Sequence, residues 1–143
     1  MALNITSGAE RAAGNGGGIK SVLLGKSGIG KTSQLYTLDP TSTLFVDHEA
    51  GDLAVQSWGG DRLDVFQEAQ RLGWSVWDVA RGLACWFGGP SPLAVMPEAI
   101  YSKAHYAAVC NTFGDPAPVL EKYTDIFVDS ITVVSRACFA WAK

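Results

Sequence analysis

Eight residues near the start of the chain have the types and spacing of a phosphate-binding loop. They follow the pattern G-x-x-x-x-G-K-[ST] and are Gly25, Lys26, Ser27, Gly28, Ile29, Gly30, Lys31 and Thr32. Glycines let successive backbone N–H groups point at one anion, and a helix that begins at the end of the loop adds the partial positive charge of its N-terminus. In this pattern the lysine reaches the β- and γ-phosphates of a nucleotide, and the threonine hydroxyl ligates Mg²⁺. We therefore expect Lys31 to contact phosphate and Thr32 to contact the metal.

A carboxylate further along the chain is predicted to share the metal with Thr32. The apolar run at 126–128 ends in Asp129. A phosphate-binding loop usually works with a second acid at the end of a neighbouring strand, which holds the water shell of Mg²⁺. Asp129 fits this role. It can also cap the helix that follows, and Ser130 can share the capping role.

A second pair of acids follows the apolar run at 43–46. Asp47 ends this run, and Glu49 comes two positions later. Hydrolysis of a nucleoside triphosphate needs a group that orients and polarises the attacking water, and we predict Glu49 for this role. Asp47 can support the metal shell or cap the turn. The alternative for both acids is a pair of solvated loop carboxylates, while His48 is expected to be exposed or to serve in packing.

The elements that must position these residues alternate between strands and helices. Short apolar runs predict strands at 19–24, 43–47 and 126–129, and helical spacing follows at 31–38 and 131–142. Such alternation predicts an α/β domain with a mostly parallel sheet flanked by helices. Open sheets of this kind bind ligands at the carboxyl ends of their strands, where Asp129 and Glu49 are expected to lie.

The long stretch at 52–122 is predicted to be a helical insertion or linker within this domain. Apolar residues recur at helical spacing over 63–72, 76–87 and 101–113, with Asp61 and Ser75 as N-caps of the first two. The chain also has five tryptophans, at positions 58, 74, 77, 86 and 141. Stacking on single-stranded nucleic acid is one use for such rings. Trp74, Trp77 and Trp86 lie at or near the helical segments, so burial against the sheet is the preferred interpretation for these three.

Composition excludes several other classes of protein. The chain has 143 residues, of which 48% are hydrophobic and 17% charged, with a formal net charge of −3. These values exclude a coiled coil, a collagen-like chain and a disordered charged tail, and bulk charge does not indicate nucleic-acid binding. The three cysteines, Cys85, Cys110 and Cys138, form no C-x-x-C pair and are expected to be reduced thiols.

The chain ends bear on domain organisation and location. Residues 1–18 are polar and rich in glycine, so we expect a flexible arm that precedes a domain at 19–143. We find no secretory signal, no transit peptide and no apolar run long enough to span a membrane, and we expect a cytoplasmic protein. Sheets usually hold about five or six strands. Three predicted strands are few for this architecture, so we expect the sheet to be incomplete at the C-terminus, and whether the chain is a fragment stays open.

Three segments together resemble the RecA-like P-loop ATPases, and within them the ATP-binding AAA/RecA-type proteins of phages and prophages. The segments are 23–32, 43–51 and 125–132. The resemblance implies ATP as the nucleotide, with Mg²⁺, a Walker A loop, Glu49 as the water-activating acid and Asp129 at the end of the Walker B strand. It also implies that the protein acts in DNA recombination or annealing, with single-stranded DNA as a partner. It further implies a homo-oligomer that works in the cytoplasm of a bacterial host.

Three functions remain open at this stage. The leading one is Mg²⁺-dependent ATP binding and hydrolysis by a RecA-like domain that serves DNA metabolism. The second is a nucleotide-gated binding module, or a DNA-packaging or loader subunit, without turnover of its own. The third is a small-molecule kinase, which would need lid arginines. Arg62, Arg71 and Arg81 lie in the middle region but at helical spacing.

Overall fold

The computed structural model describes residues 20–49 and 52–142, and the chain divides into two compact units, Met1–Lys31 and Thr32–Lys143. In the first unit, residues 20–26 have no regular secondary structure, and residues 27–31 form turns and bends. The predicted strand at 19–24 is therefore wrong for its described part, residues 20–24. The side chains of Val22, Leu23 and Leu24 are 67%, 54% and 88% exposed. A buried parallel strand needs hydrogen-bonding neighbours, and this segment has none among the described strands. The arm predicted at 1–18 lies outside the described residues.

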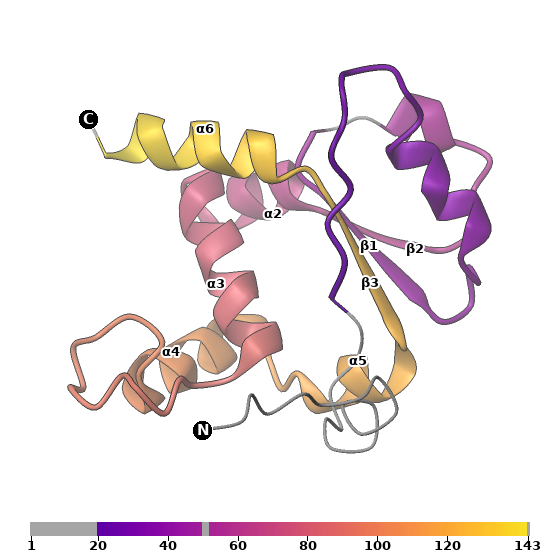
Figure 1. The fold of residues 1–143 in the computed structure, drawn as a ribbon. Helices are drawn as coiled ribbons and strands as arrows, with labels where there is room; N and C mark the ends of the chain where they lie inside the picture. Colours follow the sequence, from indigo (N-terminus) through magenta and orange to yellow (C-terminus); the bar gives the residue numbers. More distant parts are fainter. Residues whose placement is uncertain (1–19, 50–51, 143) are drawn as a thin grey trace, which may run out of the picture. The chain divides into compact units, whose positions relative to one another are not determined.

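The second unit is built on a parallel sheet of three strands among its described residues (Figure 1). They are β1 (Thr43–Asp47), β2 (Asp61–Asp64) and β3 (Asp125–Asp129), in the order β2-β1-β3. The expected strands at 43–47 and 126–129 are confirmed, and so is the parallel α/β arrangement. β2 was not predicted, because Asp61-Arg62-Leu63-Asp64 has one apolar residue and no alternating pattern.

Side chains of the central strand divide the core into two layers. Leu44 and Val46 point to the face covered by α2 (Val65–Leu72), α3 (Val76–Gly88) and α4 (Lys103–Phe113). Phe45 points to the opposite face, where it packs with Leu35 and Val55. This alternation is the two-residue period of a strand. Because both faces are covered, all five residues of β1 are buried.

Two short 3₁₀ helices cover the Phe45 side of the sheet. They are η1 (Thr32–Thr37), which carries Leu35, and η2 (Asp52–Val55), which carries Val55. A helix over 31–38 was expected, and the structure has a 3₁₀ helix in this place. The helix η1 is only six residues long and ends before Asp39-Pro40. Short helical segments of this length commonly have 3₁₀ geometry.

The middle region contributes most of the helical layer. Helices were expected at 63–72, 76–87 and 101–113, and α2, α3 and α4 are found there. Ser75 caps α3 as predicted, since its side chain accepts a hydrogen bond from the Asp78 N–H. The predicted cap of α2 is wrong: Asp61 opens β2, and Asp64 caps the helix by accepting from the Gln67 N–H at 3.0 Å.

Two more helices complete the unit, α5 (Ala117–Lys122) and α6 (Ile131–Trp141), which leaves β3 as expected. The interpretation of the tryptophans as packing residues holds for Trp86, which is buried and donates to the Gly114 carbonyl at 2.8 Å.

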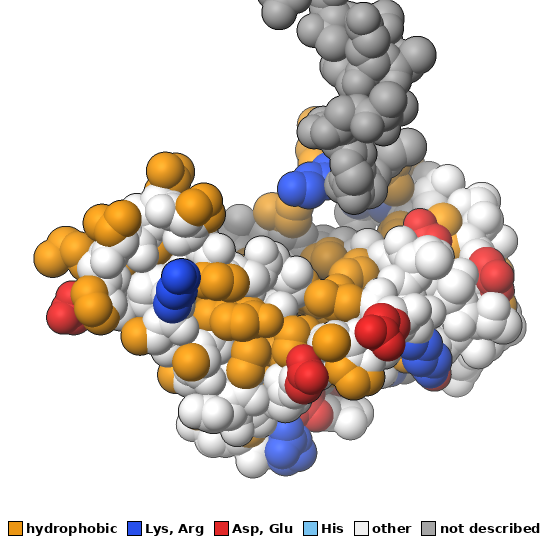
Figure 2. Space-filling view, turned by 90° about the horizontal axis from the view of Figure 1, so that it is seen from below, with side chains coloured by type: hydrophobic (Ala, Val, Ile, Leu, Met, Phe, Trp, Pro, Cys, Tyr) orange, Lys and Arg blue, Asp and Glu red, His pale blue; other side chains and the backbone are white. Residues whose placement is uncertain are grey.

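Hydrophobic side chains also gather on the surface on the side of the α3–α4 loop (Figure 2). No helix of the described residues combines the length and apolar character that crossing a membrane requires.

Candidate functional site

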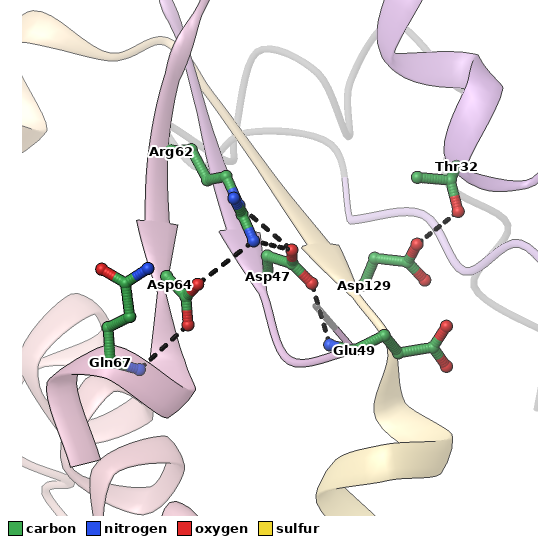
Figure 3. A network of polar contacts seen from close by, with 7 residues as sticks. All are labelled: Thr32, Asp47, Glu49, Arg62, Asp64, Gln67 and Asp129. Atoms are coloured by element: carbon green, nitrogen blue, oxygen red, sulfur yellow. Dashed lines mark hydrogen bonds and ion pairs between the residues drawn. The ribbon is translucent and has the colours of Figure 1, made fainter. Parts of the chain in front are cut away.

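The register of the sheet brings three carboxylates to one edge. Asp47 lies opposite Asp64 of β2 on one side and opposite Asp129 of β3 on the other. The three strands are parallel, so this row of acids marks their carboxyl ends. Figure 3 shows the row together with its polar partners. Asp47 and Asp129 are both buried.

The predicted metal-binding pair is in direct contact. The Thr32 hydroxyl donates a hydrogen bond to Oδ2 of Asp129, which lies 97 residues away in the sequence (Figure 3). Thr32 begins η1 and Asp129 ends β3. A hydroxyl and a carboxylate are hard oxygen ligands of the kind that Mg²⁺ prefers, so the two residues fit this cation.

No protein-only metal cage accompanies this pair. Within residues 20–49 and 52–142, no group of three or more His, Cys, Asp or Glu side chains is arranged to hold a metal ion. Mg²⁺ at nucleotide sites is typically bound by one or two protein oxygens, with phosphate oxygens and water as the remaining ligands. Thr32 and Asp129 match that pattern of incomplete coordination.

Glu49 lies in the turn after β1 and is fixed by contacts with the end of β3. Its backbone N–H donates to Oδ1 of Asp47 at 2.8 Å, and its carboxylate Oε1 accepts from the Ser130 hydroxyl at 2.5 Å. The preceding N–H, that of His48, donates to the Asp129 carbonyl at 2.6 Å. The turn therefore bridges the two strands whose acids were predicted to act together.

These contacts bear on the alternative roles of two acids. Asp47 could support the metal, cap the turn or be a solvated carboxylate, and Asp129 could bind the metal or share with Ser130 the capping of the next helix. Asp47 is 1% exposed and holds the turn through the Glu49 N–H, so it is not a solvated loop acid. Ser130 is the N-cap residue of α6 but makes no side-chain capping bond. Its hydroxyl is directed to Glu49 instead.

Sequence reasoning missed Arg62. Its Nε and Nη2 donate to Oδ2 of Asp47 at 3.1 and 2.6 Å, and Nη2 also reaches Oδ2 of Asp64 at 3.2 Å (Figure 3). Arg62 was assigned to helical spacing, whereas it belongs to β2. A four-residue polar strand carries no periodic pattern, so no signal in the sequence indicated this contact.

The three arginines do not form a cluster of the kind a kinase lid would need. Arg71 pairs with Glu68 on α2, and Arg81 pairs with Asp78 on α3. The Arg81 guanidinium also lies 5.5 Å from the ring centroid of Trp141. Each of the three arginines forms an ion pair with a different carboxylate.

His48 is buried beside the acids. The side chain is 4% exposed, and burial lowers the pKa of its imidazole, while the charges of Asp47 and Asp129 oppose that shift. A lowered pKa favours the neutral ring near pH 7. In the described part of the chain, Nδ1 of His48 makes no hydrogen bond. This agrees with the expectation of a packing residue.

The loop of the first unit has the backbone that its glycines allow. Gly28 and Gly30 have φ values of +79° and +87°, a region that other residues adopt rarely. The Lys31 ammonium donates to the carbonyls of Gly25 and Lys26 at 3.0 and 2.9 Å. It thus closes the loop on itself, and phosphate oxygens would compete with these carbonyls for the same donor.

Comparison with known proteins identifies the family. A family model described as an AAA domain matches residues 17–143, a range that includes the loop at 25–32 and all three strands. No curated protein and no solved structure matches the chain. The match covers well over half of the sequence and indicates a P-loop, nucleotide-binding domain of the ATPase type. The chain belongs to the AAA-domain family.

Proposed function

We propose that this domain binds ATP with Mg²⁺ and hydrolyses it in a RecA-like arrangement. The observation that carries the proposal is the contact of the Thr32 hydroxyl with Asp129. It joins the last residue of the phosphate-binding motif to the acid that ends β3, two positions that the nucleotide chemistry needs together. Lys31 is the neighbour of Thr32 in the chain, so the lysine of the motif is tied covalently to this pair.

Each residue has one task in the proposed reaction. The N–H groups of residues 25–31 and the Lys31 ammonium bind the phosphates, and Thr32 and Asp129 hold the metal. Mg²⁺ held by Thr32 and Asp129 would supply positive charge to the phosphate oxygens. Glu49 orients the attacking water and accepts its proton. The Ser130 hydroxyl, which donates to Oε1, fixes the direction of that carboxylate.

The RecA-like resemblance extends the proposal to DNA metabolism. We propose single-stranded DNA as a partner and a homo-oligomer as the working form, in recombination or annealing of a phage or prophage. The support is the combination of the loop at 25–32 with acids after β1 and β3, as the resemblance implies. A nucleotide-gated module without turnover remains the second candidate, because its site would need the same loop and metal pair.

The test is Mg²⁺-dependent release of phosphate from ATP, with and without single-stranded DNA. Lys31→Ala should lower turnover by about 100-fold or more, because the phosphates lose their charged donor. Lys103→Ala is the matched control, since Lys103 is exposed at the start of α4. Wild-type activity in Lys31→Ala would contradict the proposal. Lys31-dependent ATP binding without turnover would favour the gated module.

A further inference from the structure

We infer that Arg62 is a positioning residue of this site, which fixes Asp47 and, through Asp47, the turn that carries Glu49. The inference rests on the proposed function, in which Glu49 acts on the attacking water. It adds a residue from β2 to the acids that follow β1 and β3.

The contacts divide the two oxygens of Asp47 between two partners. Arg62 directs Nε and Nη2 to Oδ2, at 3.1 and 2.6 Å. The other oxygen, Oδ1, accepts from the Glu49 N–H at 2.8 Å. A guanidinium that gives two donors to one carboxylate constrains its rotation as well as its position. With Oδ2 fixed, Oδ1 is directed at the Glu49 backbone.

Arg62 is itself held from the other side. Its Nη2 lies 3.2 Å from Oδ2 of Asp64, whose second oxygen caps α2 through the Gln67 N–H at 3.0 Å. The side chain of Arg62 is 28% exposed. The guanidinium therefore lies between the carboxylate that ends β1 and the carboxylate that begins α2, and the packed α2 helix supports it.

Burial makes Asp47 depend on this partner. The Asp47 side chain is 1% exposed, and a buried carboxylate without a counter-charge is strongly unfavourable. Removal of the guanidinium should make Asp47 rotate toward water, which would break its bond to the Glu49 N–H. Glu49 would then be held by Ser130 alone at its side chain and by the His48–Asp129 bond one residue earlier.

The expected kinetic signature is a split between turnover and binding. The hydrogen bonds of Arg62 to Asp47 and Asp64 do not involve Lys31, Thr32 or Asp129, so the proposed phosphate and metal contacts should survive its loss. Arg62→Gln should lower kcat about 10- to 100-fold and change the KM for ATP less than about twofold, because misplacement of a catalytic group affects the chemical step. A role in folding alone would lower the active fraction without this split.

The experiment compares Arg62→Gln and Arg62→Lys with Arg71→Gln in the full chain. Arg71 is the matched control because it is an exposed arginine paired with Glu68 on the surface of α2. Arg62→Lys keeps a positive charge but lacks the two-donor fork, so its kcat should lie between those of Arg62→Gln and wild type. Arg71→Gln should leave kcat and KM unchanged.

A second readout does not depend on turnover. Amide hydrogen exchange of the Glu49 N–H should accelerate in Arg62→Gln, while α3 amides keep their wild-type protection. Wild-type kcat and wild-type Glu49 exchange in folded Arg62→Gln would overturn the inference. If that variant does not fold, the same result in Arg62→Lys overturns it. Lack of turnover in the wild type would instead contradict the proposed function, and the exchange data would still decide whether Arg62 holds the turn.

Discussion

Asp47 and Asp129 end neighbouring strands in register, yet their partners give them different roles. Asp129 receives a hydroxyl from Thr32, which is an oxygen ligand in its own right. Asp47 accepts hydrogen bonds from the Arg62 guanidinium and from the Glu49 backbone N–H. The guanidinium would repel a metal cation, and an N–H group cannot act as a metal ligand. Asp129 is therefore suited to a metal, and Asp47 to holding the turn.

Thr32→Val tests the metal role at the scale of one atom. The substitution keeps the shape of the side chain and removes the hydroxyl. We expect the Mg²⁺ concentration that gives half-maximal ATP turnover to rise about tenfold, equivalent to about 1.4 kcal/mol. A Mg²⁺ titration at fixed ATP measures it, with Thr112→Val, in an exposed threonine of α4, as the control. An unchanged titration would remove Thr32 from the metal site.

The cysteines offer a second prediction at this scale. Cys85 is fully buried in α3, and burial raises the pKa of its thiol above the ordinary value of 9.0. Only the thiolate reacts with alkylating reagents, and it needs access to them. In the native protein at pH 8, Cys85 should therefore be labelled at least about tenfold more slowly than Cys138, which is partly exposed. Peptide mass spectrometry resolves the two sites, and equal rates would contradict the buried placement of α3.

At the scale of elements, the site depends on strands whose positions the sequence predicts unevenly. The runs at 43–47 and 126–129 are apolar and end in acids, and both form strands. The run at 20–24 is also apolar but forms none, because pairing partners decide whether a short apolar run becomes a strand. β2 shows the reverse case, since it gains its place from pairing with β1 in spite of its polar residues.

Some parts of the candidate site can be predicted from the sequence, and others cannot. The motif at 25–32 has a fixed spacing, and Glu49 and Asp129 follow apolar runs that form β1 and β3, so the sequence can indicate them as candidates. The contacts of Arg62 and Ser130 arise from register and from the turn after β1, which no local pattern encodes. These two contacts exist only in the folded chain.

Helix capping gives a prediction at the scale of elements. Ser102 is buried, caps α4 by accepting from the His105 N–H at 3.1 Å, and donates to the Pro97 carbonyl at 2.7 Å. Ser102→Ala removes both bonds, and we expect the free energy of unfolding to fall by about 1–2 kcal/mol. Ser135→Ala is the control, because its hydroxyl only donates back to Ile131 within exposed α6 and should change stability by less than about 0.5 kcal/mol. Urea denaturation compares the two, and equal losses would refute the capping role.

At the scale of the whole molecule, the AAA-domain match spans residues that the fold assigns to two units. The phosphate-binding loop belongs to the first unit, and Thr32, Glu49 and Asp129 belong to the second. The residues of the proposed function therefore come from both units, and the proposed activity is best tested with the whole chain.

The most direct test of the central claim compares ATP binding with ATP turnover in Glu49→Gln. This variant keeps the size of the side chain and removes its ability to accept a proton. We predict that ATP binds to Glu49→Gln with an affinity within about twofold of wild type, while Mg²⁺-dependent turnover falls about 100-fold or more. Turnover at the wild-type rate in Glu49→Gln would contradict the account.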